Sequence, residues 1–493
     1  MRKNGILMPI FSLPSPYGIG TFGQAAFKFI DFLHSASQSY WQILPIGTTN
    51  FGDSPYQSFS CFAGNPYFID LDLLVVDGLL TDSEIKAYDF GDDEERVDYE
   101  KLYNNRFKIL KIAFLRFKAD NEYKEFEKKN SYWLEHYALF MAIKSSLSGA
   151  PWYEWPVDLK KREPDAISKV KLNLADDIAF HKFLQFVFNK QWLSLKRYAN
   201  QNSIEIIGDI PIYVAQDSAD VWSNPQQFLL NSDYEPKAVA GVPPDVFSAD
   251  GQLWGNPLYD WDYMKQTGYD WWKQYLACAL LRYDVVRIDH FRGFESFFSI
   301  PYGDTTALGG KWVKGPDTDL FDALKDEFGD KLPIIAEDLG VITPAVRKML
   351  KSTGFPGMKV LQFAFSGDST NAYLPHNITT NSVIYTGTHD NDTIMGWLKN
   401  SDSATVNQAK NYFNHQSDDG FNWAMIKAAQ ASVADTCIIP MADLLGLDSS
   451  GRINTPSTLG DNWCWRIKDE CINPWLANIL KENTVLYGRE SKT

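Results

Sequence analysis

Cysteine and histidine are scarce in this sequence. It has five cysteines, an odd number with no Cys-x-x-Cys pair, and seven histidines. Disulfide frameworks use an even set of cysteines, and zinc sites use closely spaced cysteines or histidines, so the sequence favours neither. Reduced thiols are typical of the cytoplasm, and we expect a cytoplasmic protein without a bound metal.

Long apolar runs and an excess of basic residues are also lacking. No apolar segment is long enough for a signal peptide or a membrane span. Basic residues number 47 against 62 acidic ones, which gives a formal net charge of −15. A negative protein repels phosphate backbones and anionic lipids, so we expect neither nucleic acid nor a membrane as partner. A neutral ligand suffers no such penalty.

Aromatic residues, in contrast, are abundant. They make up 15% of the chain, with 16 Trp and 24 Tyr. Most of these rings are expected in the core, where aromatic side chains are normally buried. Sugars present flat C–H faces that stack on exposed rings, so this composition is compatible with carbohydrate binding.

A recurring pattern predicts the fold. Short apolar segments that end in a polar residue alternate with longer amphipathic stretches. Near-continuous apolar strands between helices indicate a parallel sheet covered on both faces, and eight such units indicate a closed barrel. We therefore expect an α/β protein with a (β/α)₈ TIM barrel and large, mainly helical insertions. The predicted strands are Tyr40–Ile46, Ile204–Asp209, Asp284–Asp289, Pro333–Glu337, Met358–Phe363, Val383–Thr388 and Cys437–Met441, with Tyr67–Leu71 as a weaker eighth.

The predicted strands are unevenly spaced, which locates the insertions. Residues 1–80 and 175–493 are assigned to the catalytic barrel, and residues 81–174 to an inserted helical subdomain. Leu102–Lys118 and Phe180–Ala199 have the apolar periodicity of helices. A second insertion, residues 218–261, is rich in Pro, Gly and Trp and has little periodicity. Long loops of this kind are often functional.

Three acidic residues lie at the ends of three predicted strands: Asp289, Glu337 and Asp390. The carboxyl ends of barrel strands meet at one mouth, where active sites of this fold lie. Arg287 is two residues before Asp289, so both project from the same side of the strand. A neighbouring cation keeps a carboxylate ionised, as a nucleophile requires. An isolated Arg-x-Asp is more often structural, but three such acids together favour catalysis.

Glu337 and Asp390 have different surroundings in the sequence. Glu337 follows an apolar run, and apolar walls raise the pKa of a carboxyl, which suits a general acid and base. Asp338 is the competing acid, but strand alternation turns it away. Asp390 follows His389, a pair that fits either a metal site or hydrogen bonding to sugar hydroxyls. Because no further histidine lies at metal-ligand spacing, we favour sugar binding.

Loops after the predicted strands contain further aromatic residues. Tyr56, in a turn-rich segment, is a plausible platform for a sugar ring. Asp245, Phe247 and Trp254 lie between Gly and Pro residues in the second insertion. From these residues alone, the segment is either a lid that excludes water or a structural loop packed on the barrel.

Several long motifs resemble one family. They are WQILPIG, GDSPYQSFS and AGNPYFIDL between Trp41 and Asp70, then GDIPIYV, DVVRIDHFRG, IAEDLG and TGTHDN. In this order they resemble the amylomaltases, the 4-α-glucanotransferases or disproportionating enzymes of the α-amylase clan. The resemblance extends over nearly the whole chain.

The resemblance implies roles for these residues. Asp289 would be the nucleophile, Glu337 the acid/base and Asp390 the transition-state stabiliser of a retaining double displacement. Arg287 and His389 would contact the bound glucose. Binding residues would also include Tyr56 as the stacking ring, Asp209 near the site, and Asp245, Phe247 and Trp254 in a flexible loop over the cleft.

The resemblance also implies the partners. Members of this family are cytosolic, need no organic cofactor, and transfer glucan segments between maltodextrin, maltose and glucose. At Phe51 some relatives have Tyr, within a second glucan site, so that site is in question here.

Three other functions fit parts of the sequence. The first is an α-amylase-type hydrolase with the same three acids, and the second is a glucan-binding module without catalysis. The third is a metal-dependent barrel hydrolase.

Overall fold

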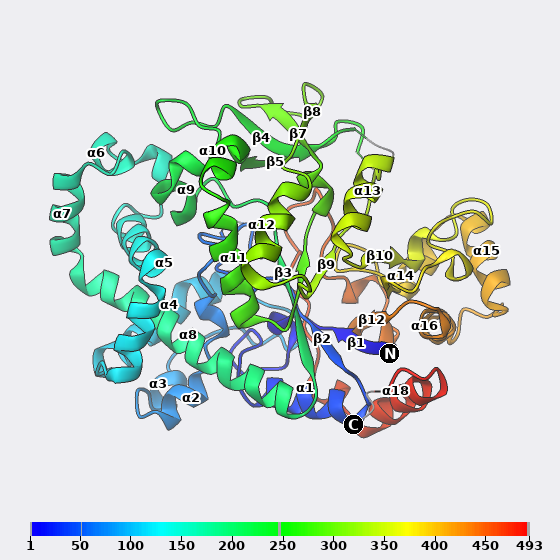
Figure 1. Ribbon diagram of the computed structural model, residues 1–493. Helices are drawn as coiled ribbons and strands as arrows, with labels where there is room; N and C mark the ends of the chain where they lie inside the picture. Colours follow the sequence, from blue (N-terminus) through cyan, green and yellow to red (C-terminus); the bar gives the residue numbers. More distant parts are fainter. Residues whose placement is uncertain (1, 51, 245–247, 491–493) are drawn as a thin grey trace.

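The computed structural model describes residues 2–50, 52–244 and 248–490, and within them eight parallel strands close into a barrel (Figure 1). The neighbours around the barrel are β1-β12-β11-β10-β9-β6-β3-β2. The predicted TIM barrel is therefore confirmed. Its strands are β1 Lys3–Leu7, β2 Tyr40–Gln42, β3 Glu205–Ile210, β6 Val285–Ile288, β9 Ile334–Ala336, β10 Gly357–Val360, β11 Ser382–Tyr385 and β12 Thr436–Pro440.

One predicted strand was wrong. Tyr67–Leu71 is not a barrel strand: it contains the short 3₁₀ helix η2 (Pro66–Phe68) and ends where α2 begins. The eighth strand is instead β1, which pairs with both β2 and β12. Asn65 and Asp70 explain the difference, because their side chains accept backbone N–H groups as helix caps. β1 was not predicted because it includes Asn4 and Gly5, both unfavourable in strands.

Helices surround the barrel, and the two predicted by periodicity are confirmed within a few residues as α4 and α8. Figure 1 shows the long α8 running beside the barrel toward α1. The helices are α1 Gln24–Ser35, α2 Leu71–Val76, α3 Asp82–Ile85, α4 Tyr99–Arg116, α5 Asn121–Ser146, α6 Val157–Lys160, α7 Pro164–Asn173, α8 Ala175–Gln201, α9 Ala219–Ser223, α10 Trp261–Gln266, α11 Asp270–Arg282, α12 Thr318–Phe328, α13 Pro344–Thr353, α14 Ile394–Asn400, α15 Ser403–Phe413, α16 Phe421–Ala431, α17 Met441–Leu445 and α18 Pro474–Leu486.

The segment 81–174 is helical and contains α3 to α7. Its buried side chains continue the core of the barrel without a break. Trp133 of α5 stacks on Phe62, which precedes η2, with ring centroids 6.3 Å apart. The division into a barrel and an inserted subdomain remains a prediction.

The second insertion is more regular than its sequence indicated. It contributes two antiparallel strands, β4 (Ala238–Val242) and β5 (Gln252–Pro257). They join β7 (Ser296–Pro301) and β8 (Lys311–Lys314) in a sheet of order β5-β4-β7-β8, at the top of Figure 1. β4 pairs with β5 inside the insertion and with residues 296–301 of β7 on its other side, and periodicity within 218–261 does not reveal this distant partner.

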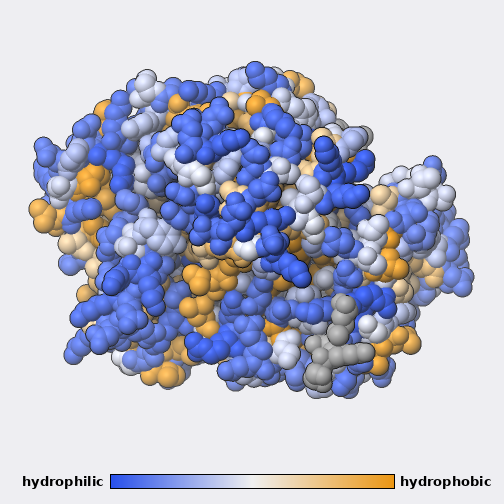
Figure 2. Space-filling view, viewed as in Figure 1, coloured by the Kyte–Doolittle hydropathy of each residue, from blue (hydrophilic) through white to orange (hydrophobic). Residues whose placement is uncertain are grey.

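The outer surface is predominantly polar, with scattered apolar residues on the face shown in Figure 2. Across the described ranges, no helix is both long and apolar enough to cross a membrane.

Close packing against the ring of Tyr283 leaves no room for a side chain at one glycine of β3. A Cβ at Gly208 would lie 2.1 Å from the ring of Tyr283, a buried residue just before β6. A Gly208→Ala substitution is expected to destabilise the protein by about 1–3 kcal/mol, because the overlap requires the backbone or the ring to move. Thermal unfolding followed by circular dichroism measures the effect.

Gly367 provides the matched control. It is exposed, and a Cβ there meets nothing within 4 Å. Gly367→Ala is therefore expected to change stability by no more than about 0.5 kcal/mol. Equal unfolding temperatures for the two variants would contradict the packing described for β3.

Candidate active site

A buried arginine organises the mouth of the barrel. Arg287 of β6 is 4% exposed, and its Nη1 lies 2.6 Å from Asp209 Oδ2 of β3 and 3.0 Å from Asp289 Oδ1. Burial would lower the pKa of Arg287, but the two carboxylates raise it well above the usual value. The guanidinium is therefore charged and holds both acids in place.

Asp289 and Glu337 leave neighbouring strands at the same level. Ile288 of β6 pairs with Ala336 of β9, so the next residue of each strand is one of these two acids. The side chain of Asp289 is 29% exposed, whereas Glu337 is 9% exposed. One carboxyl thus faces the opening and the other is sheltered beside it.

The surroundings of Glu337 favour its protonated form. Burial, followed by the negative charge of Asp289, raises the pKa of Glu337 to about 8. Arg287 and two backbone N–H groups act in the opposite direction: His290 donates to Oε2 at 2.7 Å and Leu339 donates to Oε1 at 2.7 Å. The balance keeps a proton on this carboxyl near neutral pH, beside an aspartate paired with a cation.

Asp338, the competing acid, is directed elsewhere. Its Oδ1 accepts the backbone N–H of Met358 at 2.6 Å, and its Oδ2 lies 3.7 Å from Lys359 Nζ. Both partners belong to β10, so Asp338 holds the adjacent strand, as strand alternation predicts.

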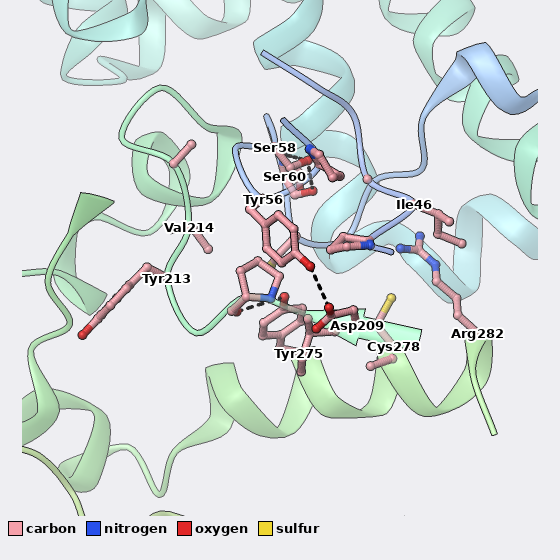
Figure 3. Close-up of a pocket in the computed structure, with 18 of the residues that line it drawn as sticks. Ile46, Tyr56, Ser58, Ser60, Asp209, Tyr213, Val214, Tyr275, Cys278 and Arg282 are labelled. Carbon is pink, nitrogen blue, oxygen red and sulfur yellow. Dashed lines mark hydrogen bonds between the residues drawn. The ribbon is translucent and has the colours of Figure 1, made fainter. Parts of the chain in front are cut away.

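Three aromatic rings form another wall of the site. Tyr56 is stacked on His389 with ring centroids 5.2 Å apart, and Trp463 lies 5.9 Å from both rings. The Tyr56 hydroxyl donates to Asp209 Oδ2 at 2.7 Å (Figure 3), which connects this wall to the Arg287 cluster. His389 Nε2 is 3.4 Å from Asp390 Oδ1.

A C-terminal loop supplies contacts that the sequence analysis did not identify. Asn454 Nδ2 donates to Asp390 Oδ1 at 2.6 Å, and Arg452 Nη2 donates to the Asp390 carbonyl at 2.7 Å. The loop also contributes Trp463. The segment belongs to no predicted strand, so only its Arg, Asn and Trp content signalled a role.

Trp254 lies beside the acid pair. Its ring meets His290 edge-to-face at 4.9 Å, and it is partly buried against the core. The structure thus brings together eight of the ten predicted site residues in one connected network. Asp245 and Phe247 lie outside the described residues, as does Phe51.

A cavity of about 40 Å³ lies behind Tyr56 and Asp209. Figure 3 shows Tyr275, Cys278 and Arg282 on its far side. Its volume suits a few water molecules but not a sugar ring. Asp289, Glu337 and Asp390 do not line it. It is therefore not the place where a sugar would meet these three acids.

In residues 2–50, 52–244 and 248–490, no group of three or more His, Cys, Asp or Glu side chains is arranged so that it could hold a metal ion.

Comparison with known proteins gives one consistent family. A sequence profile of glycoside hydrolase family 77, described as 4-alpha-glucanotransferase, matches residues 8–472. A 4-alpha-glucanotransferase of Clostridium butyricum is 51% identical over 98% of this chain and 100% of its own length. The Thermus thermophilus enzyme of the same name is 45% identical over 96% of each chain.

Solved structures agree with the sequence relatives. The amylomaltase of Streptococcus agalactiae in complex with acarbose is similar over 100% of both chains, with a TM-score of 0.96 and 42% identity. The family profile, the full-length relatives and this structure point to the same activity as the paired acids at the barrel mouth. The chain belongs to the 4-alpha-glucanotransferases of glycoside hydrolase family 77 and is an enzyme with that activity.

Proposed function

We propose that this enzyme transfers α-1,4-glucan segments from a donor maltodextrin to glucose or another maltodextrin by a retaining double displacement. Asp289 is the nucleophile, Glu337 the acid and base, and Asp390 the stabiliser of the transition state. One observation carries the proposal: two carboxyls at the same level of adjacent strands have opposite environments. Two carboxyls of this kind are what a retaining glycosidase mechanism requires.

In the first step, Asp289 Oδ attacks the anomeric carbon of the donor. The bond to the glycosidic oxygen breaks, and Glu337 gives its proton to that oxygen as the leaving sugar departs. A β-linked glycosyl–aspartate forms. Arg287 supports this step because it pairs with Asp289 and orients it, with Nη1 3.0 Å from Oδ1.

In the second step, an acceptor hydroxyl gives its proton to Glu337 and attacks the same carbon, which releases Asp289. Two inversions restore the α-linkage. Asp390 and His389 hydrogen-bond the ring hydroxyls more strongly as the ring distorts toward the transition state. Asn454 and Arg452 hold Asp390 for this purpose.

The Tyr56–His389–Trp463 wall supports a sugar as ligand, since stacked rings at a polar site suit the C–H face of a glucose unit. Maltodextrin, maltose and glucose are the proposed substrates and acceptors, and the similar Streptococcus agalactiae enzyme was solved with acarbose. The five free cysteines fit a reducing compartment, the cytoplasm.

The products of maltotriose test transfer against hydrolysis. The purified enzyme is expected to give glucose together with maltodextrins longer than maltotriose, because an acceptor sugar outcompetes water in a sheltered site. Chromatography of the products and a reducing-end assay measure the outcome. Shorter sugars alone, with a matching rise in reducing ends, would identify an α-amylase-type hydrolase instead.

Asp289→Asn tests the nucleophile. The amide cannot form the covalent intermediate, so kcat is expected to fall by about four orders of magnitude. A 5-fluoroglycosyl fluoride donor should label residue 289 of the unmodified enzyme, as detected by peptide mass spectrometry. Asp330→Asn, at an exposed aspartate, is the control and should retain full activity. Normal turnover by Asp289→Asn, or a label on another residue, would contradict the assignment.

The pH profile tests the acid. Glu337 is active as an acid when protonated, so kcat is expected to decline as the pH rises through about 8, the pKa of Glu337. Initial rates of maltotriose conversion between pH 5 and about 10 measure this limb. Glu337→Gln should remove the limb together with most of the activity. A basic limb that persists in this variant would mean that another group titrates.

A further inference from the structure

His290 occupies an unusual backbone conformation directly after Asp289. Its φ is 51°, in the left-handed region that non-glycine residues seldom adopt. Asn and His are among the residues that tolerate this region best. Strain of this kind persists only where surrounding contacts maintain it, and it concentrates at functional sites.

The conformation directs two consecutive amides at one residue. The N–H of His290 donates to Glu337 Oε2 at 2.7 Å, and the N–H of Phe291 donates to the Glu337 carbonyl at 3.1 Å. The first of these bonds is to the side-chain carboxyl and the second is to the main-chain oxygen of the same residue. The turn at His290 therefore fixes the acid both through its carboxyl and through its main chain.

The imidazole of His290 is held by packing. Trp254 meets it edge-to-face at 4.9 Å with an interplanar angle of 85°. Gly293 leaves room on another side, since a Cβ there would lie 3.1 Å from His290 Cδ2. The ring Nε2 is buried and has no hydrogen-bond partner among the residues described. Burial, then the charge of Arg292, lowers the pKa of His290 to about 3, so the ring stays neutral and acts as a packing surface.

We propose that His290 is a positioning residue that couples the Trp254 strand to the acid/base: Trp254 holds the imidazole, the imidazole maintains the left-handed turn, and the turn aims a backbone N–H at Glu337. The inference rests on the proposed role of Glu337 and extends it to a residue outside the three acids. Through this contact with His290, Trp254 also contributes to the geometry of proton transfer.

The pH profile is the decisive measurement, because an N–H donor favours the charged form of Glu337. The other groups that face Glu337 are Asp289 and Arg287 on β6 and Tyr373 beyond β10. They are unchanged in variants of His290. Loss of the N–H contact should raise the pKa of Glu337 and move the basic limb of kcat to higher pH.

Three variants test the coupling with maltotriose as substrate. His290→Ala removes the ring and is expected to lower kcat about 10- to 100-fold with little change in KM, and to move the basic limb upward by about one pH unit. His290→Asn also removes the ring, but Asn itself favours the left-handed region. The basic limb of this variant should therefore lie close to that of the unmodified enzyme. Trp254→Ala should move the limb in the same direction as His290→Ala, and the double variant no further.

His34→Ala is the matched control, at an exposed histidine of α1, and should leave kcat and its pH profile unchanged. An unmoved basic limb in His290→Ala, or a raised KM with normal kcat, would overturn the proposal in favour of simple sugar binding by the ring. Unfolding temperatures of all variants separate these outcomes from misfolding. Glu337→Gln separates failure of the proposed function from failure of the His290 coupling. If Glu337→Gln keeps the basic limb, the proposed function is contradicted. If Glu337→Gln loses the limb but His290→Ala leaves it at the same pH, only the coupling is contradicted.

Discussion

The site depends on a guanidinium that is buried between two carboxylates. Arg287 pairs with Asp209 of the adjacent strand and with Asp289 at the end of its own strand, so removal of Arg287 would leave two carboxylates without their cation. Unpaired buried charges are strongly destabilising, so both aspartates depend on Arg287. Through Asp209 the cluster also fixes Tyr56, and through Tyr56 the aromatic wall formed with His389. The ion pairs of Arg287 therefore both stabilise the site and orient the proposed nucleophile.

The contrast between Asp289 and Glu337 follows from small differences in position. Both follow the last residue of an apolar strand, at the same level of the barrel. Asp289 has the cation and is partly exposed. Glu337 is more deeply buried and lies beside a negative charge, and its backbone donors only partly offset these effects. In the proposed mechanism these two similar carboxyls take opposite roles without a metal ion, because the surroundings of Glu337 raise its pKa whereas Asp289 is paired with Arg287.

Sequence patterns predicted those parts of the fold that local periodicity controls. Apolar strands with a polar end predicted seven of the eight barrel strands, since each strand is buried on both faces, and they led to the three proposed catalytic acids. They failed where partners distant in the chain decide the structure. Lys3–Leu7 becomes a strand because β2 and β12 flank it, and β4 lies between its neighbour β5 and the distant β7.

The same limit applies to the site. Asn454 and Trp463 reach Asp390 and His389 only through the fold, and the backbone N–H of His290 has no signature in side-chain chemistry. The sequence therefore predicted the residues that are proposed to act on the substrate, but not the residues that hold them in place.

The order of strands around the barrel has a consequence for folding. β1 (Lys3–Leu7) is paired with β12 (Thr436–Pro440), and the loop at 452–463 that contacts Asp390 follows β12. Asp289 and Glu337 lie earlier in the chain than both β12 and this loop. Closure of the barrel and the contacts of Asp390 therefore depend on the same late part of the sequence.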